Sequence, residues 1–145
     1  MRSAPARPVV RARDLAVIAV GGGAGAVARY AIVRAEPVRA GTFPFTTFAI
    51  NVCGAFVLAV LLESLSRHAI DAWWLRPFAA IGVLGGFTTF STMCTEAMLL
   101  GRGGHVAMAT IYLAASGGAG IVVVVAGLRA AGLPARTVPP DEGES

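Results

Sequence analysis

Four long apolar segments follow one another along this chain of 145 residues. They run from Leu15 to Val33, from Phe45 to Leu62, from Pro77 to Leu100 and from Val106 to Leu128. The shortest has 18 residues, and as a helix it would span about 27 Å, close to the roughly 30 Å of a bilayer's hydrocarbon core. Charged residues make up only 14% of the chain, against about 25% in soluble domains. We therefore predict an all-α integral membrane protein with four transmembrane helices.

Little of the chain lies outside these segments. We predict one transmembrane domain over residues 15–128, a basic tail over 1–14 and a disordered tail over 129–145. The loop from Gly101 to His105 is short enough to join only antiparallel neighbours, which favours an up-down-up-down order. The first segment could instead be a cleaved signal peptide, but Arg29, a glycine cluster and its length favour a retained helix.

The basic residues are all arginines, and they are spread unevenly. With an even number of helices, both tails lie on one side of the membrane, and that side carries eight arginines against three on the other. By the positive-inside rule both tails are expected to be cytoplasmic, with the protein in the cell membrane. In such a chain the net charge of +4 reflects topology rather than nucleic-acid binding. Cys53 and Cys94 lie within apolar segments, and we interpret them as small packing residues.

A polar interruption lies inside the third apolar segment, where Gly85 to Thr92 read GGFTTFST. Clustered hydroxyls after two glycines offer the backbone alternatives to helical hydrogen bonds, so we predict that this helix is broken within the membrane. Non-helical backbone survives at that depth only inside protein or along a water-filled cavity. The interruption therefore indicates an ion or solute site.

Three of the other polar residues within the apolar segments each have two interpretations. Arg29 either reaches back to the membrane surface or lines an aqueous vestibule. Asn51, which shares a helical face with Thr47, either joins two helices or donates into a pore. Glu96 is either a paired carboxylate or, in a proton-coupled exporter, the coupling site; we favour the paired form.

Glycines with small-xxx-small spacing occur in the first and third segments. Such pairs let helix backbones approach closely, which matters because lipid provides no hydrophobic drive for helices to associate. We interpret them as packing signals: Gly21 with Gly25, and Gly82 with Gly86.

Taken together, these residues resemble the Fluc-type fluoride channels of the CrcB family over nearly all of residues 15–128. The resemblance rests on GGAGAVARY at Gly22–Tyr30, on GGFTTFST with the later Glu96 in the third segment, and on five residues of the second and fourth segments: Thr47, Asn51, Gly54, Tyr112 and Ser116. Each motif alone is weak, and their combination is specific.

The resemblance implies an antiparallel dimer with two pores, through which cytoplasmic fluoride leaves passively. This export would lower the toxicity of fluoride inside the cell. It also implies a structural sodium ion, not transported, held at the dimer centre by the backbone carbonyls of Gly85 and Thr88. Arg29 is then expected near the vestibule. The fluoride path is expected to be lined by Asn51, Thr47, Phe90, Thr92, Met93, Tyr112 and Ser116. The expected partners are fluoride, membrane lipid and a second subunit, without nucleic acid.

Two positions depart from the family pattern. Met93 stands where a second phenylalanine is usual, so one ring edge that could contact an anion is lost. Gly120 stands where a serine commonly continues the polar track. An antiparallel homodimer needs the same chain inserted in both orientations, and the arginine bias disfavours this. The alternative to a homodimer is therefore a heterodimer with a homologous subunit of opposite charge bias.

Two further classes remain as alternatives. A small proton-coupled multidrug exporter would need an acidic residue in the first helix, and Glu96 is the only substitute for one. A non-transporting membrane subunit would need only glycine-rich packing faces, and the GGFTTFST interruption argues against it. No nucleotide-binding loop occurs, and we expect no enzymatic activity.

Overall fold

The computed structural model describes residues 11–36, 41–67 and 72–132, and their regular structure is helical throughout. The helices are α1 (Ala12–Ala35), α2 (Phe45–Arg67), η1 (Arg76–Leu84), α3 (Gly85–Phe87), α4 (Phe90–Arg102) and α5 (Val106–Ala130). Because η1, α3 and α4 succeed one another within Arg76–Arg102, the described residues form four stretches long and apolar enough to cross a membrane. The predicted all-α architecture with four transmembrane helices is confirmed.

The helix ends differ from the apolar segments mainly by extending beyond them. α2 and α5 begin where the sequence predicts, whereas α1 begins at Ala12, inside the stretch assigned to the tail. The carboxylate of Asp14 accepts a hydrogen bond of 3.2 Å from the backbone N–H of Arg11 and so satisfies an orphan donor at this helix start. Most of both predicted tails lies outside the described residues.

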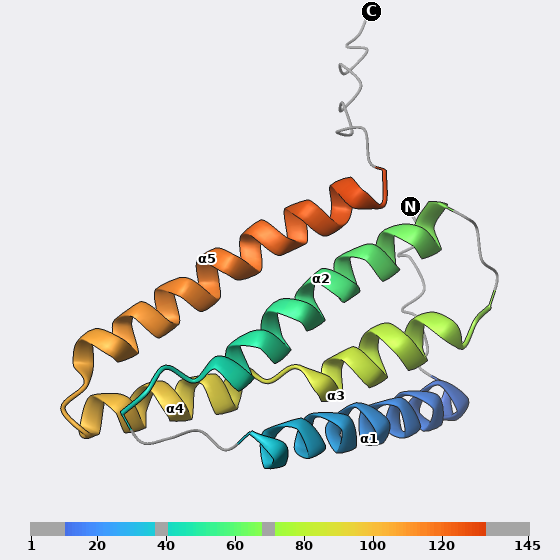
Figure 1. The fold of residues 1–145 in the computed structure, drawn as a ribbon. Coiled ribbons are helices and arrows are strands. Elements are labelled where there is room, and N and C mark those ends of the chain that lie inside the picture. The colour runs from blue at the N-terminus through green and yellow to red at the C-terminus, as the bar shows by residue number, and fades with distance from the viewer. Residues whose placement is uncertain (1–10, 37–40, 68–71, 133–145) are drawn as a thin grey trace, which may run out of the picture.

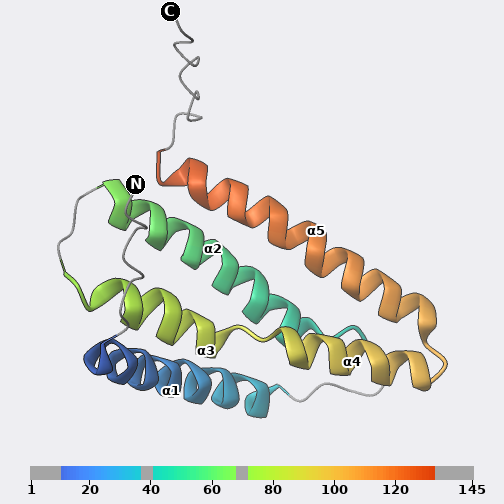
Figure 2. The same cartoon turned by 180° about the vertical axis from the view of Figure 1, so that it is seen from behind.

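Consecutive spans run in opposite directions, and α1 and α5 lie at opposite edges of the bundle (Figure 1). Seen from behind, α2 and the third span occupy the middle (Figure 2). α1 packs mainly on η1 and α3, while α5 packs on α2 and α4. The third span is therefore in contact with the helices on both sides of it, and its interruption lies between them.

Direct backbone contact joins α1 to the first half of the third span. Gly21 and Gly25 are buried there, and a methyl group at Gly21 would lie 2.5 Å from the carbonyl oxygen of Phe78. From the other side, a methyl group at Gly82 would lie 2.9 Å from the carbonyl oxygen of Ile18. The two small-xxx-small pairs thus face each other, as their interpretation as packing signals requires.

The first half of the third span, η1, is a π-helix rather than the α-helix that its hydrophobicity suggests. Pro77 lies in its first turn, where its missing N–H would have no helical acceptor. Backbone carbonyl groups of η1 approach the glycines of α1, with the carbonyl of Phe78 near Gly21 and that of Val83 near Gly25. Departures from α-helical winding are frequent near functional sites, and η1 leads directly into the interruption.

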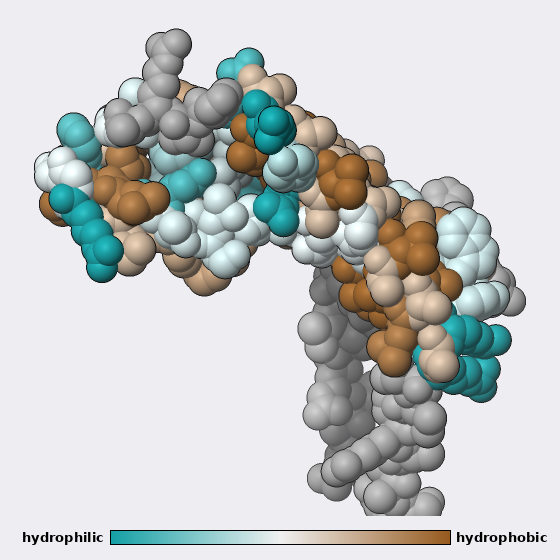
Figure 3. Space-filling model, turned by 90° about the horizontal axis from the view of Figure 1, so that it is seen from below, coloured by the Kyte–Doolittle hydropathy of each residue, from teal (hydrophilic) through white to brown (hydrophobic). Residues whose placement is uncertain are grey.

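Large apolar side chains are exposed along the whole length of the helices, including Val20, Phe45, Phe90 and Ile121. Hydrophobic side chains cover much of the face seen in Figure 3. Soluble proteins seldom expose apolar surface this extensive, whereas a surface in contact with lipid or with another subunit can be apolar. Cys53 and Cys94 are exposed too, so the packing role interpreted from the sequence is not met inside this single chain.

Candidate functional site

The third span loses its helical conformation at two residues of the GGFTTFST stretch. α3 ends at Phe87 and α4 begins at Phe90. Between them Thr88 has φ −79° and ψ 153°, and Thr89 has φ −148° and ψ 113°, so both are extended. The interruption falls in the stretch for which clustered glycines and hydroxyls predict it.

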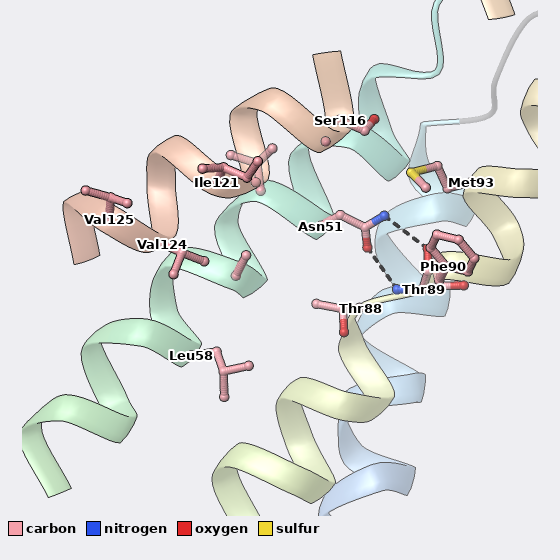
Figure 4. Close-up of a pocket in the computed structure, with 14 residues that line it drawn as sticks. Asn51, Leu58, Thr88, Thr89, Phe90, Met93, Ser116, Ile121, Val124 and Val125 are labelled. Carbon is pink, nitrogen blue, oxygen red and sulfur yellow. Dashed lines mark hydrogen bonds between the residues drawn. The ribbon is translucent and has the colours of Figure 1, made fainter. Parts of the chain in front are cut away.

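Asn51 on α2 pairs with the peptide of Thr89 across this gap. Its Oδ1 accepts a hydrogen bond of 2.8 Å from the backbone N–H of Thr89, and its Nδ2 donates one of 3.0 Å to the Thr89 carbonyl (Figure 4). A carboxamide carries the same donor and acceptor as a peptide group. Asn51 therefore satisfies two backbone groups that the missing helical turn leaves unpaired.

Thr89 also caps the second half of the span. Its Oγ1 accepts a hydrogen bond of 3.1 Å from the backbone N–H of Thr92 and donates one of 2.9 Å to the hydroxyl of Thr92. Thr88 closes the first half, because its N–H and its hydroxyl both donate to the carbonyl of Leu84. The two neighbouring threonines thus end one helix and begin the next.

Arg29 on α1 approaches the interruption from the opposite side to Asn51. Its Nε donates a hydrogen bond of 3.2 Å to the carbonyl of Gly86. This places a guanidinium charge at the C-terminal end of the η1–α3 helix, where the helix dipole favours a cation. The expected vestibule residue is therefore engaged with the backbone of the interrupted span.

Glu96 on α4 is held by two hydroxyl donors. Thr47 Oγ1 donates to Oε1 at 2.8 Å, and the hydroxyl of Tyr112 donates to Oε2 at 2.8 Å. Thr47 is only 1% exposed and Tyr112 is fully buried. This geometry is that of a paired carboxylate, the interpretation favoured from the sequence over a proton-coupling site.

A groove of about 630 Å³ opens beside the interruption, between α2, α4 and α5. Four residues of the expected fluoride path line it: Asn51, Phe90, Met93 and Ser116. Phe90 is 75% exposed, and Ser116 contributes a buried hydroxyl oxygen that has no hydrogen-bond partner among the described residues. Beyond Ser116 the wall becomes apolar with Ile121, Val124 and Val125 (Figure 4).

The residues expected from the sequence thus separate into two neighbouring groups. Asn51, Phe90, Met93 and Ser116 share the groove, whereas Thr47 and Tyr112 are buried around Glu96. Thr92 is bonded to Thr89, a residue that the sequence reasoning did not single out. Thr89 lies immediately before a helix and has a hydroxyl residue, Thr92, three positions later. This pattern is the signal that could have identified Thr89 as a helix cap.

A small multi-pass membrane protein with an interrupted third span is the class that this fold and site define. Residues 16–128 match the family model described as "CrcB-like protein, Camphor Resistance (CrcB)". The chain therefore belongs to the CrcB family, in agreement with the resemblance seen in its motifs.

Several curated relatives carry the name fluoride-specific ion channel. The chain is 44% identical over 126 residues to FluC 3 of Streptomyces avermitilis, covering 84% of this chain and 60% of that protein. It is 43% identical over 130 residues to FluC 2 of Nocardia farcinica, covering 89% and 93% of the two chains. It is 39% identical over 118 residues to FluC of Xanthomonas euvesicatoria, covering 81% and 89%. These relatives are named as channels, which are not a class of enzyme.

Proposed function

We propose that this chain forms a fluoride-specific ion channel in the cell membrane and lets cytoplasmic fluoride leave passively. The observation that carries the proposal is the interrupted span beside a groove lined by a ring and an unpartnered hydroxyl. A pore for a small, strongly hydrated anion must replace water with donors and positive ring edges. The names of the family relatives support the same assignment.

The fluoride path in this proposal follows the groove. Ser116 offers its hydroxyl, Phe90 offers a ring edge, and Asn51 keeps a second amide hydrogen after pairing with Thr89. Three further residues frame the path: Thr92, Thr47 and Tyr112. Of these, Thr47 and Tyr112 hold Glu96 beside it through their hydroxyls. Met93 packs against the buried cluster around Tyr112 and contributes a flexible thioether to the wall.

A structural sodium ion is the second part of the proposal, held by the backbone carbonyls of Gly85 and Thr88 and not transported. Oxygen ligands suit a hard cation, and unwound backbone at an interrupted helix supplies carbonyls for such ions. Gly85 is exposed on the surface of the single chain, and Thr88 has the extended conformation that removes its carbonyl from the helical pattern. The residues present therefore fit this ion.

An antiparallel dimer is the third part. A single chain offers two carbonyls, too few to surround a cation, whereas a symmetric second subunit doubles them. Gly85 and Phe90 are exposed on the single chain, which supports a contact between the interruption and a partner. The partner is a second copy or a homologous subunit.

The described arginines retain the asymmetry seen in the whole sequence. Arg11, Arg13, Arg67, Arg76 and Arg129 lie at the end of the bundle where the chain enters α1 and leaves α5, whereas Arg34 and Arg102 lie at the other. At the richer end Arg13 stacks over the ring of Trp73 at 4.4 Å, an arrangement suited to a membrane interface. In our proposal both tails are cytoplasmic where one orientation dominates.

Growth of a bacterial strain that lacks its own fluoride channel tests the function. Cells that express the chain should grow at fluoride concentrations that arrest cells with an empty vector. A Thr110→Val variant, altered at an exposed residue whose hydroxyl donates a hydrogen bond to the carbonyl of Val106 on its own helix, should protect equally. Failure to protect, with the protein present in the membrane fraction, would contradict a self-sufficient channel.

A further inference from the structure

In an unbroken α-helix each backbone N–H donates to the carbonyl four residues before it. Applied to the third span, the N–H of Thr89 would donate to the carbonyl of Gly85. The N–H of Thr92 would donate to the carbonyl of Thr88. These two acceptors are the carbonyls that our proposed function assigns to sodium.

Both amides are bonded to side chains instead. The N–H of Thr89 donates to Oδ1 of Asn51 at 2.8 Å, and the N–H of Thr92 donates to Oγ1 of Thr89 at 3.1 Å. Each side-chain acceptor thus replaces one carbonyl as the partner of its helical amide. The carbonyls of Gly85 and Thr88 lose their helical donors as a result.

Neighbouring carbonyls of the same stretch are occupied from outside the span. The carbonyl of Gly86 accepts from Nε of Arg29 at 3.2 Å, and that of Thr89 accepts from Nδ2 of Asn51 at 3.0 Å. Among the residues that the structure describes, side-chain donors thus occupy two carbonyls of the stretch but not those of Gly85 and Thr88. A cation that enters the interruption therefore meets carbonyls with free lone pairs rather than a fully bonded helix.

We propose that Thr89 and Asn51 are positioning residues of the cation site, because their side-chain oxygens take the two amides that would otherwise occupy the carbonyls of Gly85 and Thr88. The inference rests on the proposed sodium ion. In this role the hydroxyl of Thr89 acts through the backbone and does not itself contact the ion. Removing it would let the amide of Thr92 compete for the carbonyl of Thr88.

Sodium-dependent thermal unfolding of the purified full-length protein in detergent tests this role. Sodium is exchanged for N-methyl-D-glucamine at constant ionic strength. The half-saturating sodium concentration, which is the dissociation constant of the folded protein, is obtained by fitting the logarithmic rise of the unfolding temperature with sodium concentration. For Thr89→Val, which exchanges the hydroxyl for a methyl group, we expect this concentration to rise about tenfold, the effect typical of losing a helix cap. Thr89→Ser keeps the hydroxyl and should restore the wild-type value.

The half-saturating concentration distinguishes this role from general loss of stability. A variant that is only less stable unfolds at lower temperature in all sodium concentrations, and its half-saturating concentration stays in place. Thr110→Val is the matched control, because it removes a threonine hydroxyl from α5 that donates to the carbonyl of Val106 on the same helix, away from the interruption. Thr89→Ala takes the place of Thr89→Val if the valine variant does not fold.

The outcomes distinguish the positioning role of Thr89 from the existence of the sodium site. An unchanged half-saturating concentration in Thr89→Val, or a serine variant as weak as valine, overturns the positioning role while leaving the sodium site intact. A wild-type protein whose unfolding does not respond to sodium overturns the sodium site and this inference together. Fluoride flux through that same protein would still decide the channel function separately.

Discussion

Asn51 and Thr89, which are 38 residues apart in the sequence, exchange two hydrogen bonds of 2.8 and 3.0 Å. Through this pair α2 supplies to the interrupted span the donor and acceptor that a helical turn would have supplied. The conformation of the interruption is therefore set by a neighbouring helix as much as by its own residues. Asn51 consequently has a structural task beside any contact with an anion.

Asn51→Asp should weaken the fold as well as the transport. The carboxylate can still accept from the N–H of Thr89, but it has no donor for the carbonyl of Thr89 and repels it. We expect the free energy of unfolding to fall by about 1–3 kcal/mol, the usual cost of an unsatisfied buried group. Thermal unfolding in detergent measures this loss, with Cys53→Ser at an exposed position of the same helix as the control. Unchanged unfolding would show that the pairing contributes nothing.

Gly25→Ala should disrupt the contact between α1 and the third span. A methyl group at Gly25 would overlap the carbonyl oxygen of Val83 and lie 2.9 Å from the backbone nitrogen of Phe87. Overpacking of this kind costs about 1–3 kcal/mol. Gly23→Ala on the same helix meets no atom within 4 Å, so it should leave stability unchanged or raise it slightly. Equal yields and unfolding temperatures for the two variants would contradict the packing.

Arg29→Gln should destabilise the interruption, since it removes the guanidinium from the carbonyl of Gly86. Arg34→Gln is the matched control, because the side chain of Arg34 is exposed and donates to the hydroxyl of Tyr30 on its own helix. We expect a loss of about 1–2 kcal/mol for Arg29→Gln and less than about 0.5 kcal/mol for Arg34→Gln. Unfolding of both purified variants against the wild type gives the comparison. Equal losses would remove the special role of Arg29.

Tyr112→Phe should leave Glu96 with one hydroxyl donor in place of two. Hydrogen bonds to charged groups contribute about 1.5–3 kcal/mol, and Tyr112, which donates to Glu96, belongs to the buried cluster of α4 and α5. The other tyrosine of the chain provides the control, because Tyr30 is 61% exposed. Tyr30→Phe should therefore be nearly neutral. A neutral Tyr112→Phe would mean that the carboxylate does not depend on this bond.

Gly120→Ser should be accepted by the fold and should add a polar group to the groove. A methyl group at Gly120 meets no atom within 4 Å, and Ser116 lies one helical turn before it. Extending the hydroxyl surface into the apolar part of the groove should raise the rate of fluoride efflux from liposomes. A folded variant with lower efflux than the wild type would place the anion path elsewhere.

The arrangement of spans could be predicted from the sequence because a bilayer sets the length of an apolar helix. Phe45 and Val106 are correct helix starts for this reason. The interruption was predictable too, since the glycines and hydroxyls of GGFTTFST stand out against their apolar surroundings. The π-helical winding of η1 was not, because its side chains form an ordinary apolar pattern.

The hydrogen bonds that join the residues of the site were harder to predict than the residues themselves. Asn51 stands out as a polar residue in an apolar segment, but no pattern reveals that its partner is the peptide of Thr89. Likewise the bond from Arg29 to Gly86 joins residues 57 positions apart and depends on how α1 packs. Glu96 could be expected to be paired, but its two partners come from α2 and α5.

Fluoride efflux from liposomes that hold the purified wild-type chain, compared with chloride efflux from the same preparation, tests the proposed channel most directly. An ion-selective electrode for each anion records the release after the membrane potential is clamped with a potassium ionophore. We predict release of the trapped fluoride while the chloride is retained, without a proton gradient. Release of both anions alike, or release only when a pH gradient drives it, would contradict a passive, fluoride-specific channel.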